Sequence, residues 1–200
     1  MSQHYFSYPA VSNSMLSAFE RKIFNMYVPK LEHTYEFGSI AHQLILEPHR
    51  ELLAPELVTE TEMESIYEMC EAAKRNRQLS WLCQFSRKEV EVFWQDETTG
   101  LPLKSKLDIS YKNLIISDLK TTSSKTEKAF RSSMIKFGYL RQAAYYLDSV
   151  QGKRFVFFAI QKHAPFNVFQ VELTREEIAT GRKQYRKLLD KAHQMKHFNF

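Results

Sequence analysis

A change of hydrophobic period close to residue 88 limits the fold more than any other feature of this sequence. Upstream, apolar residues recur at helical spacing. Downstream, EVEVFW (89–94) and KSKLDISY (104–111) alternate between apolar and polar residues, as half-buried strands do, and ETTG (97–100) between them is a turn signal. LIISDLK (114–120) is apolar enough for a central strand. These segments predict a three-stranded meander.

Helical spacing predicts three helices before the meander. They are expected after Ser12 or Ser14, after Gly38, and over roughly residues 61–78. Two capping boxes predict the later helices: Ser124 with Glu127 opens one that runs to about Ser149, and Thr174 with Glu177 opens a long basic one. FVFFAIQK and NVFQVEL, around Pro165, predict two more strands. This order predicts an α/β (α+β) fold with a mixed central sheet flanked by helices, in a single domain over residues 1–200.

Composition narrows the class of protein. A chain with 44% hydrophobic and 14% aromatic residues is not a disordered one. We expect a cytoplasmic protein, because neither a membrane-spanning run nor an export signal is evident. Cys70 and Cys83 could form one disulfide, but reduced thiols suit that compartment better. Two cysteines are too few for a four-cysteine iron–sulfur cluster.

The stretch ISDLKTTSS (116–124) ends an apolar strand on an acid and a lysine. Asp118 and Lys120 are two positions apart, so they share one face of the strand. Taken alone, such a pair is more often an ordinary ion pair than a functional site. A second carboxylate, Asp108, lies on the preceding strand. It faces the same way as Asp118 only if the connecting loop has an odd length or a bulge, and we predict such a loop.

Two carboxylates and an ammonium at a sheet edge are the groups that metal-assisted phosphodiester hydrolysis needs. Glu89 is a further candidate ligand, although Glu91 shares its face and leaves the assignment open. His42 could supply an imidazole from the second helix, although a lone helical histidine is more often structural. In GYLRQAAYY, residues Tyr139, Gln142 and Tyr146 form one stripe at helical spacing, and a packing stripe rarely contains Gln. A water-facing helix boundary is the alternative.

The charge distribution permits a polyanionic partner without requiring one. The net charge is +5, with glutamates concentrated in 47–71 and Lys and Arg in 174–196. Ser12 and Ser14 could bind a terminal phosphate through backbone amides at a helix start, although capping explains them equally well. Arg131, Lys136 and Arg141 share the predicted helix of Gln142 and are candidate DNA contacts, with a solvated face as the simpler alternative.

Six residues, each within a recognisable local motif, carry a family resemblance. They are His42 in GSIAHQLILEP, Glu89 in EVEVFW, Asp108 in KSKLDIS, Asp118 and Lys120 in ISDLKTTS, and Gln142 in YLRQAAYY. In this order they resemble the PD-(D/E)xK nuclease superfamily, most of all the RecE (exonuclease VIII) type of phage recombination exonuclease, with lambda exonuclease as a more distant relative. The likeness runs from about Ser12 to Tyr146, and Leu107 replaces the proline of the family name.

The resemblance implies a restriction-endonuclease-like core and a Mg²⁺-dependent active site, with Mn²⁺ as a substitute ion and no iron–sulfur cluster. The implied roles are metal binding by Asp108 and Asp118, completion of the metal sites by His42 and Glu89, positioning of the nucleophilic water by Lys120, and support from Gln142 and Tyr146.

The resemblance also implies 5′ to 3′ digestion of linear duplex DNA for recombination, in the cytosol of a bacterial or phage-infected host cell. It further implies a single-strand annealing protein as partner, and a homo-oligomeric ring, a trimer or tetramer, with no membrane association. Two alternatives stay open: a structure-specific or nicking endonuclease with the same metal site, and a non-catalytic DNA-binding protein of the same fold.

Overall fold

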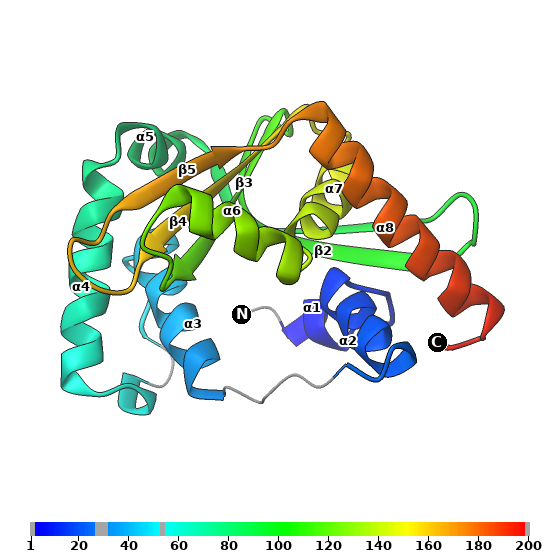
Figure 1. The fold of residues 1–200 in the computed structure, drawn as a ribbon, viewed down its shortest axis with the longest axis horizontal. Helices are drawn as coiled ribbons and strands as arrows, with labels where there is room; N and C mark the ends of the chain where they lie inside the picture. The colour runs from blue at the N-terminus through cyan, green and yellow to red at the C-terminus, as the bar shows by residue number, and fades with distance from the viewer. Residues whose placement is uncertain (1–2, 27–31, 53–54, 199–200) are drawn as a thin grey trace.

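The computed structural model describes residues 3–26, 32–52 and 55–198, and its centre is a five-stranded sheet (Figure 1). The strands are β1 (Arg87–Gln95), β2 (Pro102–Tyr111), β3 (Ile115–Thr122), β4 (Arg154–Gln161) and β5 (Val168–Glu172). They lie in the order β1-β2-β3-β4-β5, with β3 and β4 parallel and the other neighbours antiparallel. The predicted meander and mixed sheet are confirmed.

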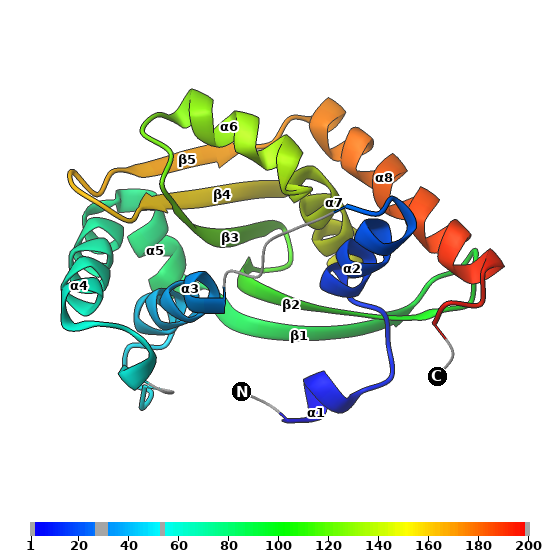
Figure 2. The same ribbon diagram turned by 60° about the horizontal axis from the view of Figure 1, so that its bottom comes forward.

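Helices cover both faces of this sheet (Figures 1 and 2). In chain order they are α1 (Gln3–Ser7), α2 (Asn13–Ile23), α3 (Glu32–Leu46), the 3₁₀ helix η1 (Pro55–Leu57), α4 (Glu60–Arg75), α5 (Arg77–Phe85), α6 (Glu127–Lys136), α7 (Tyr139–Val150) and α8 (Arg175–Gln194). Helices α3, α4 and α5 pack on one face, and α6 and α7 pack on the other. In a third cluster, α2 and α8 pack against α7.

Strand β4 explains why both faces must be covered. Its residues Phe155, Phe157 and Ala159 are fully buried against the α6–α7 layer. The alternate residues Val156, Phe158 and Ile160 are buried against the α3–α5 layer. A strand buried on both faces reads as an unbroken apolar run, which is the pattern of FVFFAIQ.

The single helix predicted from residue 124 to about 149 is wrong in two respects. Its cap is Thr126, whose side chain accepts a hydrogen bond from the Ala129 N–H at 3.1 Å, and Ser124 does not cap it. The helix is also divided into α6 and α7 at Gly138, which has a left-handed φ of 69°. Glycine adopts this conformation without a steric penalty, so the chain turns there and redirects α7. The Thr174–Glu177 capping box of α8 is confirmed.

Two upstream boundaries also differ from the prediction. Gly38 lies inside α3 and does not precede it. A Cβ on Gly38 would lie 3.7 Å from Thr121 Oγ1 of β3. The helix predicted over 61–78 is two helices joined at Asn76, whose extended backbone ends α4 while its side chain caps α5 through the Leu79 N–H at 2.9 Å. Local apolar spacing continues through this junction, so periodicity alone does not reveal the turn.

Helices α7 and α8 are in very close contact at Gly181. A Cβ on Gly181 would lie 1.9 Å from the Leu140 carbonyl oxygen, so only glycine permits this backbone approach. Leu140 is one turn before Ala144, and both belong to the helix that carries Gln142. Packing of α8 therefore sets the position of α7. Among the described residues, no helix combines the length and hydropathy needed to cross a membrane.

Candidate active site

The site lies where β2 separates from β3. Strand β2 pairs with β1 along its length but with β3 only from Ile109 to Tyr111, and the β1–β2 hairpin then bends away from β3 (Figure 2). The connecting loop has three residues, 112–114, which confirms the predicted odd length. Continuing the register by one step places Asp108 opposite Asp118. The two carboxylates therefore share a face, at the point where the ladder opens.

The Asp108 carboxylate accepts a hydrogen bond from the β3 backbone at this opening. Its Oδ2 accepts from the Leu119 N–H at 2.8 Å. Burial raises the pKa of Asp108 to about 6, against the opposing effect of the Lys120 ammonium, and the negative charge of Glu89 raises it further. Burial also raises the pKa of Asp118 to about 6, and Asp108 adds to that rise. The fold thus buries neighbouring carboxylates although their ionised forms are disfavoured there, and such perturbed pKa values are typical of functional sites.

Lys120 is the basic group of the cluster. Its Nζ contacts Asp118 Oδ2 and lies 5.1 Å from the ring centre of Tyr139 and 5.8 Å from that of Phe157. Burial lowers the pKa of Lys120, but Asp118 and Asp108 outweigh burial and raise it overall. Lys120 is therefore a cation at neutral pH. It can donate hydrogen bonds and offset negative charge, but it cannot act as a general base.

The stripe predicted on the helix reaches the site. Gln142 Nε2 donates to Asp118 Oδ1 at 2.8 Å, and the side chains of Gln142 and Tyr146 are hydrogen-bonded. Burial, with Asp118 nearby, raises the pKa of Tyr146 well above its ordinary value, so its hydroxyl stays neutral. Tyr139 from the same stripe packs beneath Lys120. All three stripe residues therefore lie in the site, so the water-facing alternative is wrong for this helix.

The structure distinguishes Glu89 from Glu91. Glu89 and Asp108 lie between the Lys88–Ile109 and Val90–Leu107 pairs of the β1–β2 ladder, and the Glu89 charge acts on both Asp108 and His42. Glu91 lies opposite Lys106 and acts on Tyr5 instead. Glu89 also has a left-handed φ of 54°, which is strained for a residue in a strand. Such strain is often retained where a side chain has to be directed toward a site.

His42 approaches the acids from α3. Its Nδ1 lies 3.5 Å from Asp108 Oδ2, and the ring is also hydrogen-bonded to the Leu119 backbone. Burial, assisted by the Lys120 charge, lowers the pKa of His42 to about 4. A neutral imidazole at pH 7 has a lone pair available for a metal ion. His42 on α3 and Gln142 on α7 thus approach the strand opening from different helices.

The predicted DNA contacts lie at the start of α2, on α6 and on α7. Ser12 caps α2 by accepting from the Met15 N–H at 3.3 Å, and its hydroxyl lies 2.8 Å from that of Ser14. Arg131 joins α6 to α8 by bonding Glu127 and Glu177.

Arg141 is not on a solvated surface as expected. Its side chain is 3% exposed and bonds Asn13, Ser17 and Glu20, so it ties α7 to α2. For Arg141, therefore, the predictions of a solvated side chain and of a surface DNA contact are both wrong. The signal that was missed is that Arg141 is directly adjacent to Gln142 in a helix buried on two sides.

The donor set suits a hard divalent cation. Asp108, Asp118, Glu89 and the neutral His42 provide oxygen and nitrogen ligands. Burial raises the pKa values of Asp108 and Asp118, neighbouring acids raise them further, and a bound cation would offset both effects. Among the described residues, no three His, Cys, Asp or Glu side chains already form a metal-binding group. Instead Lys120 contacts Asp118, and Lys106 contacts Glu89.

Lys106 was overlooked in the sequence. It stands two positions before Asp108, on the same strand face, and this spacing was the available signal. Its charge lowers the pKa of Asp108.

Comparison with known proteins identifies the family. The search of curated proteins gives no match. Among solved structures, a candidate exonuclease from Eubacterium rectale aligns over 94% of this chain and 85% of its own, with 15% identity and a TM-score of 0.68, which shows a shared fold.

Two further structures align more weakly. They are a phage-related exonuclease from Haemophilus somnus 129PT (13% identity, 94% of this chain and 98% of that one, TM-score 0.44) and an alkaline exonuclease from Laribacter hongkongensis (14%, 98% and 97%, TM-score 0.44). No conclusion follows from TM-scores this low. The family model of a PDDEXK-like domain of unknown function (DUF3799) matches residues 17–199, and this confirms the PD-(D/E)xK resemblance. The chain therefore belongs to this PDDEXK-like family.

Proposed function

We propose that this protein is a metal-dependent deoxyribonuclease of the RecE type that digests linear duplex DNA from its ends, in the 5′ to 3′ direction. One observation carries the proposal: the Lys120 ammonium contacts Asp118, which lies opposite Asp108, at the opening between β2 and β3. This is the acid, acid, lysine set that phosphodiester hydrolysis requires. The family membership supports the same reading.

Each residue has a role that follows from its surroundings. Asp108 and Asp118 would hold the divalent cation, Mg²⁺ or in its place Mn²⁺, and His42 and Glu89 would complete its sites. The chemistry it would supply there is polarisation of the phosphoryl oxygen and activation of water. Lys120 stays protonated, so it orients the attacking water and offsets charge that develops on the phosphoryl oxygens.

Gln142 and Tyr146 keep Asp118 in place. The amide of Gln142 bonds Asp118 Oδ1, which leaves Oδ2 directed to Lys120. Tyr146 bonds Gln142 in turn, so the orientation of the carboxylate is set by two side chains of one rigid helix. These are positioning residues. In the proposed setting the DNA is held by Ser12, Ser14 and Arg131, a single-strand annealing protein receives the 3′ tail, and copies of the chain form a ring.

The deciding experiment uses linear duplex DNA labelled separately at its 5′ and 3′ ends, with Mg²⁺ or with EDTA, beside covalently closed circular DNA. We expect Mg²⁺-dependent loss of the 5′ label from linear DNA, no cutting of the circle, and no activity in Lys120→Met. Lys153→Met, which changes an exposed lysine just before β4, is the matched control and should stay active.

Other outcomes contradict parts of the proposal. Loss of the 3′ label first reverses the polarity. Cutting of the closed circle indicates an endonuclease with the same metal site. Binding without any cleavage in Mg²⁺ or Mn²⁺ indicates a DNA-binding protein that retains the fold.

A further inference from the structure

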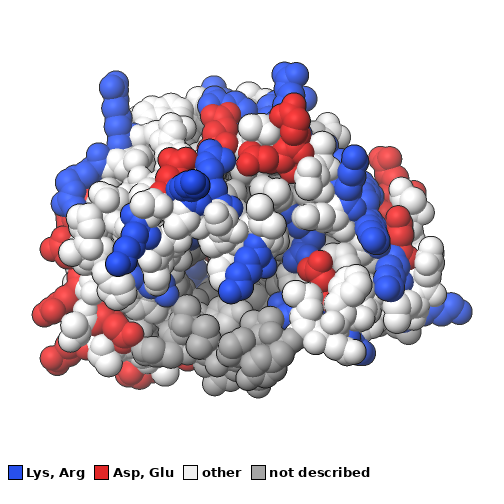
Figure 3. Space-filling model, in the orientation of Figure 1, with Lys and Arg blue, Asp and Glu red and all other residues white. Residues whose placement is uncertain are grey.

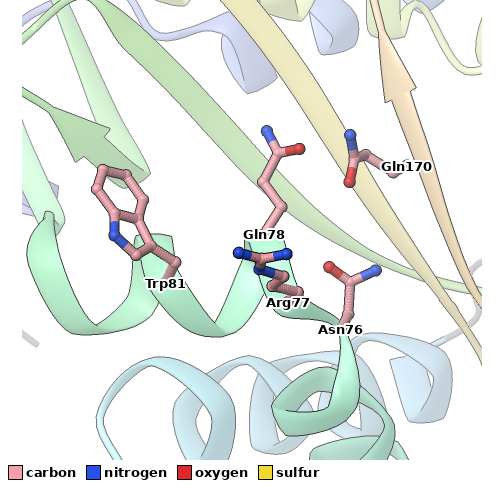
Figure 4. Close-up of a pocket in the computed structure, with 5 residues that line it drawn as sticks. All are labelled: Asn76, Arg77, Gln78, Trp81 and Gln170. Carbon is pink, nitrogen blue, oxygen red and sulfur yellow. The ribbon is translucent and has the colours of Figure 1, made fainter.

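A hollow on the α5 side of the sheet lies outside the site described above. It has a volume of about 410 Å³ and is lined by Asn76, Arg77, Gln78, Trp81 and Gln170. Figure 4 shows Trp81 at one end, with Gln78 from α5 and Gln170 from β5 extending along the hollow. This volume falls in the range of about 300–1,000 Å³ found for sites that hold small organic groups.

Trp81 is the aromatic wall of this hollow. Its side chain is 43% exposed, although large aromatic residues usually gain stability by burial. Its ring centre lies 4.9 Å from that of Tyr111 and 5.4 Å from that of Phe85, which is itself 55% exposed. These neighbours restrict the Trp81 ring on one side. The ring is thus held in place with part of its surface open to solvent.

The rest of the hollow carries polar groups with unused hydrogen-bonding capacity. Among the described residues, the amides of Gln78 and Gln170 have no hydrogen bond to a protein group, and Arg77 has no acidic partner. Lys88 and Lys112 add exposed positive charge beside the aromatic residues, and Lys112 lies 5.3 Å from the Tyr111 ring centre. Free amides, a guanidinium and an exposed indole together suit a nucleobase and its phosphate.

We propose that this hollow binds an unpaired stretch of DNA, with one base stacked on Trp81, its edge bonded by Gln78 and Gln170, and its phosphate paired with Arg77. The inference rests on the proposed nuclease function, because that reaction leaves one strand unpaired. The location agrees, since Tyr111 is three residues beyond Asp108 on β2, about 10 Å along the strand. The hollow therefore lies near the active site along β2, on the α3–α5 side of the sheet.

The surrounding charge favours a single strand over a duplex. Acidic side chains gather over α4, at the lower left of Figure 3, where Glu64, Glu68 and Glu71 are exposed. Helix α4 ends at Asn76, which lines the hollow, and its acidic surface repels a continuous double row of phosphates laid across that helix. A short single strand needs fewer cations, because base stacking supplies much of its binding free energy.

The test measures binding of a labelled oligothymidylate by fluorescence anisotropy in EDTA, so that no cleavage interferes. We expect Trp81→Leu to weaken binding about five- to a hundred-fold, the effect of losing one base–aromatic stack. Arg77→Glu should also weaken it, and an acid at the first position of α5 favours the helix, so this variant should fold. Phe24→Leu, which alters an exposed ring at the end of α2, is the control and should bind normally.

Tryptophan fluorescence reports direct contact between the DNA and Trp81. The chain has two tryptophans, and Trp94 packs at 5.0 Å from Tyr145 within the fold. In a Trp94→Phe background, the oligothymidylate should quench the emission of Trp81. Unchanged affinity in both Trp81→Leu and Arg77→Glu, or no quenching, overturns the inference. Duplex binding that Trp81→Leu weakens as much as it weakens oligothymidylate binding also overturns it.

Failure of this inference differs from failure of the nuclease proposal. Duplex cleavage in Mg²⁺ with binding that is independent of Trp81 removes only the single-strand site. Binding that depends on Trp81, without cleavage, removes only the nuclease.

Discussion

Replacing Asp118 by Asn tests whether the active site is built at the expense of stability. The Asp118 side chain is 2% exposed and lies among Asp108, Lys120 and Gln142. Asparagine has nearly the same shape and keeps an oxygen that accepts from Gln142. The substitution therefore removes the negative charge while leaving the packing of the site nearly unchanged.

The expected size follows from the pKa. Burial raises the pKa of Asp118 from 3.8 to about 6, so the folded state holds the proton more tightly than the unfolded state. The stability that this carboxyl contributes is fully present below pH 3.8 and is lost as the pH rises through about 6. A rise of roughly two pKa units corresponds to about 3 kcal/mol in the free energy of unfolding.

The assay is urea unfolding of the metal-free wild type and Asp118→Asn at several pH values between 4 and 8. Between pH 4 and pH 7, the wild type should lose about 3 kcal/mol relative to the variant. The lowered pKa of His42 gives stability that falls as the pH drops, the opposite sign, but both proteins share His42 and its effect largely cancels in the difference.

Parallel pH curves for the two proteins would falsify the reasoning, because they would show that ionised Asp118 costs nothing. Divalent ions provide a second readout. Mg²⁺ or Mn²⁺ should restore stability to the wild type at pH 8 and do so far less in Asp118→Asn, which should also lose cleavage.

Three further changes probe the support of the site. Gln142→Leu should raise the Mg²⁺ concentration for half-maximal cleavage about 10- to 100-fold, because Asp118 loses its positioning amide; unchanged metal dependence contradicts this role. Lys106→Met should raise the pKa of Asp108 further and move the acid limb of the pH–rate profile to higher pH, since the Lys106 charge lowers that pKa; an unmoved limb argues against the coupling. Gly181→Ala should lower the free energy of unfolding by about 1–3 kcal/mol or more, measured by urea denaturation, because its Cβ meets the Leu140 carbonyl; a wild-type midpoint shows that the helices can separate.

Much of the fold is predictable from local pattern. Alternation identified β1 and β2, and the apolar segments LIISDLK and FVFFAIQK identified β3 and β4. The boundaries at Gly38, Asn76 and Gly138 were not predictable in the same way, because apolar spacing continues across each of them. At Gly138 the break depends on a left-handed backbone conformation that spacing does not encode.

The active site, too, was predictable in part from the sequence. Side-chain chemistry and motif order singled out Asp108, Asp118, Lys120 and Gln142, and strand parity required an odd loop for the acids to meet. Which glutamate turns toward them, Glu89 or Glu91, follows from strained backbone and from the neighbouring strand.

The sequence by itself determined the element types, the meander and the residues capable of metal-assisted chemistry, because these depend on side-chain type and on neighbours a few positions apart. The tertiary structure decided where β2 leaves β3, how Arg141 becomes buried against Asn13, and how Trp81 and Gln170 come to line one hollow. Those contacts join segments far apart in the chain. No local pattern specifies them, because they depend on how the helices and the sheet pack together.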